Sequence, residues 1–266
     1  MKITFQPSVL FYWFFSLAAL FLVIITPTQV GADTSNEYEG GRGLITLDGP
    51  SGLFLNPTSG TLPERASTIQ YCVFFPENRN DIVGHGVLAA YGVTDEFEFG
   101  GIATILDFDG GDPSERGAGG PFARYRFTKD DGFIPQVSLG ASARVGDTLL
   151  NKYSVFVASY KRIPIDEGGI LRSIGFHGGL KELFFDSDLP EDDSFSVYGG
   201  IEVQFPLRLY AVGEVQTKDT DIDLHVPYSF GAQWRASGIA MSIAGIQNGG
   251  TSDISFYYGI GGSVTF

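Results

Sequence analysis

The chain has 266 residues, of which 18% are charged, and a formal net charge of −14. This acidic balance excludes the basic surface that nucleic-acid binding requires. The single cysteine, Cys72, excludes an internal disulfide framework and is predicted to be a small buried or lipid-facing residue. A mean hydropathy of only +0.08 does not exclude a membrane barrel, because only alternate strand residues of a barrel meet lipid.

Residues 1–32 predict a cleaved signal peptide. Lys2 supplies a positive start, 9–25 form an apolar core, and Val30, Gly31 and Ala32 place small residues before the expected cleavage site. An uncleaved helical anchor is the alternative, since the apolar run approaches the ~18 residues that begin to span a bilayer. Beyond residue 32 no segment is long and apolar enough for a membrane helix, so membrane residence must come from strands.

Residues 33–64 predict a lead-in or plug segment rather than part of a barrel wall. The first part, 33–43, is polar and rich in Gly and Glu. A short apolar run, 44–47, precedes the turn-rich stretch 48–64, which contains Gly49-Pro50 and Asn56-Pro57. These turn signals are typical of a periplasmic lead-in or of a plug within a barrel.

From residue 65 onward, short alternating runs separated by turn residues predict an all-β chain. The 36 Gly, 23 Phe and 12 Tyr fit many short strands. The fold class is therefore a transmembrane antiparallel up-and-down β-barrel of about 12 strands over 65–266. The expected strands are 65–75, 83–93, 96–108, 121–127, 134–145, 152–162, 171–185, 194–205, 207–217, 227–236, 238–247 and 253–266.

The connections between these strands give an independent indication. Outer-membrane barrels alternate long external loops with short periplasmic turns. Here the connections 109–120, 186–193 and 218–226 would be external, while 94–95, 206 and 237 would be periplasmic. The connection 163–170 is an exception, being long but periplasmic.

The last strand alternates as a barrel strand should. Val264, Ile260 and Tyr258 share a face suited to lipid, whereas Ser263 and its even-spaced neighbours share a face suited to water. A terminal strand that ends on Phe266 resembles the signal read by outer-membrane assembly machinery. We therefore predict Phe266 as an assembly signal at the periplasmic rim.

The same alternation projects a set of charged residues into the lumen. Successive strands offer opposite signs, so cross-strand pairs are expected. One interpretation is a selectivity lining for a charged solute, and the other is a salt-bridged network that fills a narrow barrel. The predicted lumen residues are Glu98, Arg124, Arg126, Arg144, His177, Lys181, Glu202, Arg208, Glu214 and Arg235.

Signatures of catalysis or cofactor binding are absent from the sequence. His85, His177 and His225 lie in separate segments, without a recognisable nucleophile pair or zinc motif. We predict no enzyme activity, no cofactor and no metal; His225 beside acidic residues leaves a barrel hydrolase as a distant alternative. The acidic segments 107–115 and 186–193 are suited to Ca²⁺ or to divalent ions that bridge lipopolysaccharide, or simply to solubility.

Several short motifs resemble YjbH-type outer-membrane proteins. They are Gly52-Leu53-Phe54-Leu55-Asn56-Pro57-Thr58 before the first strand, the hairpin 91–98, and the central strands 134–140 and 153–161. The resemblance implies an outer-membrane barrel associated with exopolysaccharide production, with no catalytic residues. The Asn-Pro element is also similar to fatty-acid-channel barrels.

Together these patterns predict an exported barrel in the outer membrane of a diderm bacterium. It would support envelope polysaccharide export or the passage of a small solute through a charged lumen. The expected partners are outer-membrane lipid, lipopolysaccharide, the barrel-assembly machinery, and a polysaccharide or small solute. The alternatives are a fatty-acid-channel-like transporter for hydrophobic solutes and a plugged structural or interaction barrel.

Overall fold

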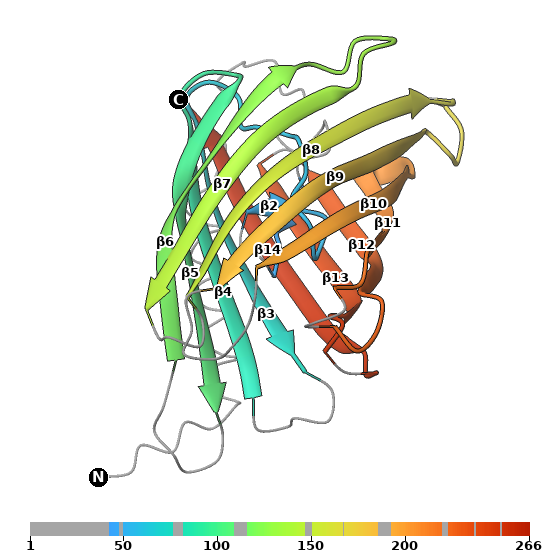
Figure 1. Ribbon diagram of the computed structural model, residues 1–266. Coiled ribbons are helices and arrows are strands. Elements are labelled where there is room, and N and C mark those ends of the chain that lie inside the picture. The colour runs from blue at the N-terminus through green and yellow to red at the C-terminus, as the bar shows by residue number, and fades with distance from the viewer. Residues whose placement is uncertain are drawn as a thin grey trace, which may run out of the picture. The chain divides into compact units, whose positions relative to one another are not determined.

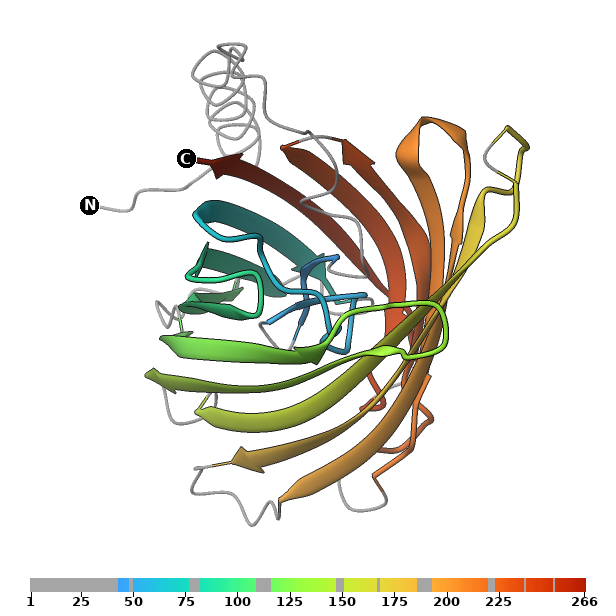
Figure 2. The ribbon, with the colours of Figure 1, turned by 90° about the horizontal axis from the view of Figure 1, so that it is seen from above.

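Twelve strands, β3 to β14, close into one antiparallel barrel (Figures 1 and 2). Each strand pairs with its neighbours in the sequence, and β14 closes the ring against β3. The computed structural model describes residues 43–47, 50–76, 82–108, 116–146, 151–166, 168–185, 193–219, 223–236, 238–250 and 252–266. The predicted signal peptide, 1–32, lies outside these residues, and within them no helix is long and apolar enough to cross a bilayer. The predicted all-β, twelve-strand antiparallel barrel is confirmed.

The strand boundaries follow the predicted alternation closely. The barrel strands are β3 (Ala66–Phe75), β4 (Ile82–Gly92), β5 (Phe97–Phe108), β6 (Arg116–Thr128), β7 (Gln136–Gly146), β8 (Lys152–Pro164), β9 (Ser173–Phe185), β10 (Ser194–Gln204), β11 (Leu209–Gln216), β12 (Tyr228–Ala236), β13 (Ile239–Gln247) and β14 (Ser255–Thr265). The main difference is β6, which begins at Arg116 although residues 116–120 were expected in a loop. Gly120 approaches the carbonyl of Ala143 so closely that a Cβ would lie 2.2 Å from that oxygen, so glycine permits tight strand pairing here.

The two ends of the barrel carry different connections. We call the end where β3 begins and β14 ends the terminal rim, and the opposite end the loop rim. The shortest connections, 93–96, 205–208 and 237–238, all lie at the terminal rim. The connections 129–135 and 165–172 also lie there and are longer, so the predicted sorting of loop lengths is real but incomplete.

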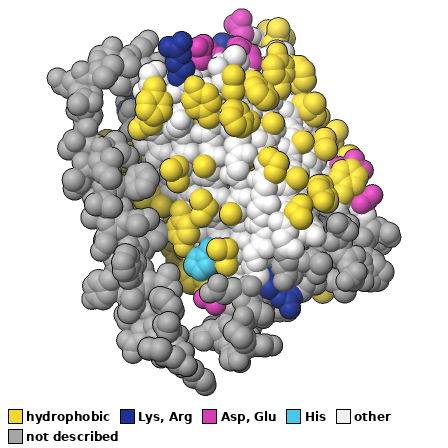
Figure 3. Space-filling model, turned by 90° about the vertical axis from the view of Figure 1, so that its left-hand side faces the viewer, with side chains coloured by type: hydrophobic (Ala, Val, Ile, Leu, Met, Phe, Trp, Pro, Cys, Tyr) yellow, Lys and Arg dark blue, Asp and Glu magenta, His cyan; other side chains and the backbone are white. Residues whose placement is uncertain are grey.

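The outer wall of the barrel is apolar. On β14, Phe256 and Tyr258 are exposed, while Tyr257 and Ser263 face inward and are buried. The space-filling view shows hydrophobic side chains spread over the wall, with Lys and Arg side chains near its upper and lower edges (Figure 3). An apolar band bounded by polar rims is the surface that a bilayer requires.

The segment 43–65 occupies the lumen (Figure 2, blue). It contains a small antiparallel pair, β1 (Leu44–Ile45) and β2 (Ser51–Gly52), and its described residues from 50 to 62 are all buried. Leu53, Phe54 and Leu62 form one apolar cluster with inward-facing wall residues such as Leu88 and Tyr257. We call residues 43–65 the plug. The apolar core of this protein therefore lies between plug and wall, inside the barrel.

Candidate functional site

Glu214 on β11 accepts four hydrogen bonds from the plug. One of its carboxylate oxygens accepts hydrogen bonds from the backbone N–H groups of Phe54, at 2.8 Å, and Leu55, at 2.6 Å. The other oxygen accepts from the backbone and side-chain N–H groups of Asn56, at 3.1 and 3.0 Å. Such charge-assisted hydrogen bonds offset the cost of burying a carboxylate. Glu214 thus holds three consecutive plug residues through the backbone.

Neighbouring strands hold the same part of the plug. Lys181 Nζ on β9 donates to the side-chain oxygen of Asn56 at 2.9 Å, and the Tyr198 hydroxyl on β10 donates to the next carbonyl along the plug at 2.8 Å. Gln233 on β12 donates to the carbonyl of Leu53 at 3.0 Å. These side chains come from one arc of the wall, so they fix the plug on that side of the lumen.

The opposite arc holds the plug through an ion pair. Glu98 on β5 and Arg124 on β6 are direct cross-strand partners, their charged atoms lie 3.6 Å apart, and both side chains are 0% exposed. The Leu62 backbone N–H donates to Glu98 at 2.8 Å. Arg124 donates to the carbonyls of Ser51, at 2.9 Å, and Gly60. A cross-strand pair of opposite charges exists here, as predicted, and both members also hydrogen-bond to the plug.

A second charged cluster, closer to the terminal rim, belongs to the wall. Glu202 on β10 lies 2.8 Å from the Arg235 guanidinium of β12 and accepts from the Tyr160 hydroxyl of β8 at 2.9 Å. His177 Nε2 on β9 is 3.5 Å from the same carboxylate, and Arg235 stacks over the Tyr210 ring at 4.2 Å. Because these partners span β8 to β12, the cluster ties non-adjacent strands together across the lumen.

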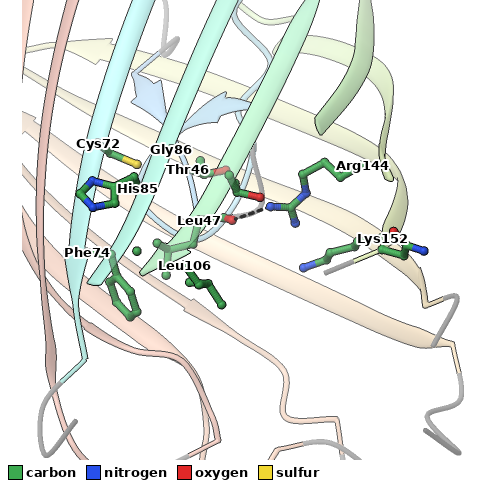
Figure 4. A pocket seen from close by; sticks show the side chains of 12 residues that line it. Thr46, Leu47, Cys72, Phe74, His85, Gly86, Leu106, Arg144 and Lys152 are labelled. Carbon is green, nitrogen blue, oxygen red and sulfur yellow. Dashed lines mark hydrogen bonds between the residues drawn. The ribbon is translucent and has the colours of Figure 1, made fainter. Parts of the chain in front are cut away.

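A cavity of about 290 Å³ remains between the plug and the loop rim (Figure 4). We call it the vestibule. Leu47 at the plug tip, Phe74 on β3 and Leu106 on β5 supply an apolar side, and Arg144 on β7 and Lys152 on β8 supply a basic side. Arg144 and Lys152 are direct cross-strand partners, and Arg144 points toward the Leu47 carbonyl at 3.5 Å.

The plug joins the wall at the terminal rim through the turn between β4 and β5. Thr61 donates to the Asp95 carbonyl at 2.6 Å, and the Glu64 backbone N–H donates to the Asp95 carboxylate at 3.0 Å. That N–H, together with nearby Lys129, holds the pKa of Asp95 below its ordinary value although partial burial opposes the shift. The negative form of Asp95 therefore favours the docked end of the plug.

Most of the predicted lumen residues face the lumen. Arg126 lies half-buried toward the terminal rim, near the end of β6. Arg208 differs, because the chain forms a short 3₁₀ turn at Pro206–Arg208 with φ of 60° at Leu207 and Arg208, and β11 begins only at Leu209. The buried, inward-facing members are Glu98, Arg124, Arg144, His177, Lys181, Glu202, Glu214 and Arg235.

The structure groups these residues differently from the sequence pattern. Glu202 and Arg235 meet, as expected, but Glu214 turns to the plug and Arg208 stays in its rim turn. Sequence reasoning did not name Tyr160 or Tyr198 as site residues, although both lie on the inward parity of their strands. Only the position of the plug shows that Tyr198 contacts it.

The histidines do not form a common site. His85 Nδ1 lies 2.7 Å from the Tyr71 hydroxyl, His177 belongs to the Glu202 cluster, and the His225 backbone N–H donates to the Gly249 carbonyl at 2.9 Å. Asp221, the expected neighbour of His225, lies outside the described residues, as do 109–115 and 186–192 of the acidic segments. Within the part of the chain that the structure describes, no group of three or more His, Cys, Asp or Glu is arranged to hold a metal ion.

A solved porin shares this fold, and two further solved structures match it more weakly. A KdgM porin matches with a TM-score of 0.53 and 12% identity, over 75% of this chain and 99% of that chain. The translocator domain of the autotransporter NalP from Neisseria meningitidis matches with a TM-score of 0.34 and 11% identity, over 76% of this chain and 87% of its own. OmpT of Vibrio cholerae matches with a TM-score of 0.30 and 11% identity, over 76% and 96%.

No protein-family model and no curated protein matches the sequence. At 12% identity the likeness to the porin concerns the fold alone. The plug contacts and the vestibule are therefore argued from this chain's own residues. By architecture, the chain is a β-barrel of the outer-membrane type.

Proposed function

We propose that this protein is an outer-membrane channel for a small solute, closed at rest by its own plug. The observation that carries the proposal is the set of hydrogen bonds from Glu214 to three consecutive plug residues. Eight-stranded barrels are just filled by their own side chains, whereas barrels of 16 or more strands leave an aqueous channel. The twelve strands here enclose an intermediate space, and the plug fills it through contacts that are non-covalent and therefore reversible.

The apolar outer wall supports a membrane location. Outward residues such as Ile201, Phe230 and Ile243 are exposed along the strands, where a bilayer would cover them. We extend the proposal to the outer membrane of a diderm bacterium, with the terminal rim toward the periplasm and lipid and lipopolysaccharide around the wall. The signal peptide and the role of Phe266 in assembly remain predictions.

The solute is the finer part of the proposal. The resemblance to YjbH-type barrels extends it to export of an envelope polysaccharide, and that extension depends on short motifs alone. The apolar side of the vestibule favours instead the alternative of a solute with a hydrophobic part. No catalytic role belongs to the proposal, and a permanently plugged structural barrel is the competing function.

Conductance across planar bilayers tests the channel. Wild-type protein should stay closed for most of the recording, because the plug occupies the lumen. Glu214→Ala combined with Gln233→Ala should open frequently, since both side chains hold the plug. Ile201→Ala, on the outer face of β10, is the matched control and should behave like the wild type.

Deletion of 43–62 gives the strongest version of the same test. Each variant is first checked for a change in gel mobility on boiling in detergent, which a closed barrel should show. A folded, inserted deletion variant that conducts no ions would refute the channel and favour the permanently plugged barrel. Defined conductance steps from that variant would support the proposal.

A further inference from the structure

We propose that two neighbouring hairpins at the terminal rim, β6–β7 and β8–β9, form a ledge that inserts into the bilayer leaflet on that side. The ledge consists of the connections 129–135 and 165–172 together with the end of β8 that contacts the first of them. Its partner is lipid, at the depth of the headgroups and the first part of the acyl chains. The proposal rests on the membrane location of the barrel and goes beyond the channel, because a permanently plugged barrel would carry the same ledge.

The two connections expose large apolar side chains. Phe133 is 100% exposed and Ile170 is 79% exposed, and Ile134 and Ile165 add to the same surface. Large apolar side chains that gather on exposed turns mark an interaction surface. The ledge is therefore expected to contact something other than water.

The tip that presents Phe133 is a formed turn. Asp131 and Ile134 exchange two backbone hydrogen bonds, of 3.2 and 3.0 Å, so Gly132 and Phe133 are the two tip residues. Gly132 has a φ of 51°, a conformation that glycine adopts without steric cost. The exposure of Phe133 is therefore built into a defined backbone structure.

Lys161 on β8 holds this turn on the lipid side of the wall. It pairs across the ladder with Phe176, which is exposed on the outer face, so the Lys161 side chain also projects outward. Its ammonium group donates to the Asp130 carboxylate and to the Gly132 carbonyl of the turn. The other Asp130 oxygen accepts from the backbone N–H of Arg162 at 2.8 Å. These contacts fix the turn where the lipid around the wall can reach it.

The ledge continues the apolar wall, which identifies lipid as its occupant. On β6, Tyr125 and Phe127 are exposed on the outer face, and their rings meet edge to face with centroids 5.1 Å apart. Aromatic residues in this position form the interfacial girdle of membrane barrels. Ile163 is likewise exposed near the end of β8. The apolar surface thus extends from the wall along β6 and β8 into the two connections.

The β8–β9 hairpin reaches away from the ring of strands (Figures 1 and 2, yellow). The backbone N–H of Ile165 donates to the Arg172 carbonyl at 2.9 Å, so strand pairing continues beyond the ends of β8 and β9. The hairpin therefore extends sideways as a paired structure, in the direction that contact with the surrounding leaflet requires.

Nitroxide spin labels on the full-length protein in nanodiscs test the ledge. Phe133→Cys and Ile170→Cys are labelled separately in a Cys72→Ser background. Relaxation of each label by oxygen, which concentrates in lipid, is compared with relaxation by a nickel chelate, which stays in water. Ile201→Cys on the outer wall is the lipid reference, and Glu64→Cys, exposed at the terminal rim, is the water reference. We expect the oxygen-to-chelate ratio of both ledge labels to approach the lipid reference and to exceed the water reference.

Lys161→Met tests how the turn is positioned. We expect this variant to lower the ratio of the label at Phe133 toward the water reference, because the turn loses the two contacts that the ammonium group supplies. Lys218→Met is the matched control, since Lys218 donates to the Leu224 carbonyl at 2.9 Å at the loop rim. It should leave the ratio unchanged. The same ratio in Lys161→Met and wild type would overturn the role of Lys161.

Two results would overturn insertion into lipid. A ratio at Phe133 and Ile170 equal to that at Glu64 would place the ledge in water, where a soluble protein could bind it. Protection from both reagents, with spectral broadening that dilution by unlabelled protein removes, would instead show a second copy of the chain on the ledge.

The shift in gel mobility on boiling confirms that each variant is folded. If Phe133→Cys does not fold, the label at Ile170 decides alone. Conductance of the plug-deleted variant does not depend on the ledge, so failure of the channel and failure of the ledge are distinguishable.

Discussion

Two cross-strand pairs of charged residues in the same lumen differ in sign. Glu98 and Arg124 are opposite charges beside the plug, whereas Arg144 and Lys152 are like charges beside the vestibule. The first pair is 0% exposed and shares its hydrogen bonds with plug backbone groups. The second pair lines open space. The difference teaches that the first pair stabilises the fold, whereas repulsion between the two members of the second pair would by itself cost stability.

The two other predicted lumen carboxylates, Glu214 and Glu202, differ in what they bind. Glu214 binds plug backbone, and Glu202 binds wall side chains from other strands. Both therefore have structural partners, which favours the structural interpretation of the predicted charge network for this section. The selectivity interpretation remains a prediction, and the vestibule, whose lining includes Arg144 and Lys152, is where it can be tested.

The largest expected effect is the loss of Arg124. Arg124→Ala leaves the buried Glu98 carboxylate without its cation and the plug without two donors, so we expect a loss of about 3 to 5 kcal/mol in the free energy of unfolding. Arg144→Ala should cost about 1 kcal/mol, because it also relieves repulsion from Lys152. Urea unfolding of both variants in detergent measures the difference. Equal losses in the two variants would contradict the view that the two pairs differ in their effect on stability.

A smaller effect of opposite sign is expected at Lys152. Lys152→Glu converts the like-charge pair into an opposite pair with Arg144, so it should raise the free energy of unfolding by about 0.2 to 1 kcal/mol. Lys181→Glu is the control, since it removes a donor to Asn56 and should destabilise the protein. Destabilisation by Lys152→Glu would contradict the view that the vestibule pair carries a cost.

The smallest effect concerns pH and the plug's exit at the terminal rim. The pKa of Asp95 lies below its ordinary 3.8 because the Glu64 N–H binds the charged form. A lowered pKa means that this stabilisation is fully present above the ordinary value and is lost as the pH falls through the lowered one.

Asp95→Asn should therefore be less stable than the wild type at pH 7, and the gap should close as the pH falls below about 4. Unfolding midpoints across this pH range measure the gap. Glu96→Gln, in the same turn, controls for loss of a surface charge near Lys129. A constant gap between Asp95→Asn and wild type at all pH values would contradict the assigned role.

The sequence by itself determined the wall of the barrel. Side chains alternate between the two faces of a strand, so Ser263 faces inward and Val264 faces outward independently of the neighbouring strands. Turn residues mark where each strand ends. Local signals failed where packing overrides them. The glycines at 117–120 read as a loop but pair tightly in β6, and Leu207 and Arg208 read as a strand but form a turn with positive φ.

Only the tertiary structure decided what the inward charges do. Parity shows that Glu214 and Glu202 point into the lumen, but it cannot show that one meets the plug backbone and the other meets Arg235. Those partners are separated by long stretches of chain, and Glu214 contacts residues about 160 positions away. The path of 43–65 through the lumen depends on closure of the barrel and on burial of Leu53, Phe54 and Leu62 within it, which no local pattern encodes.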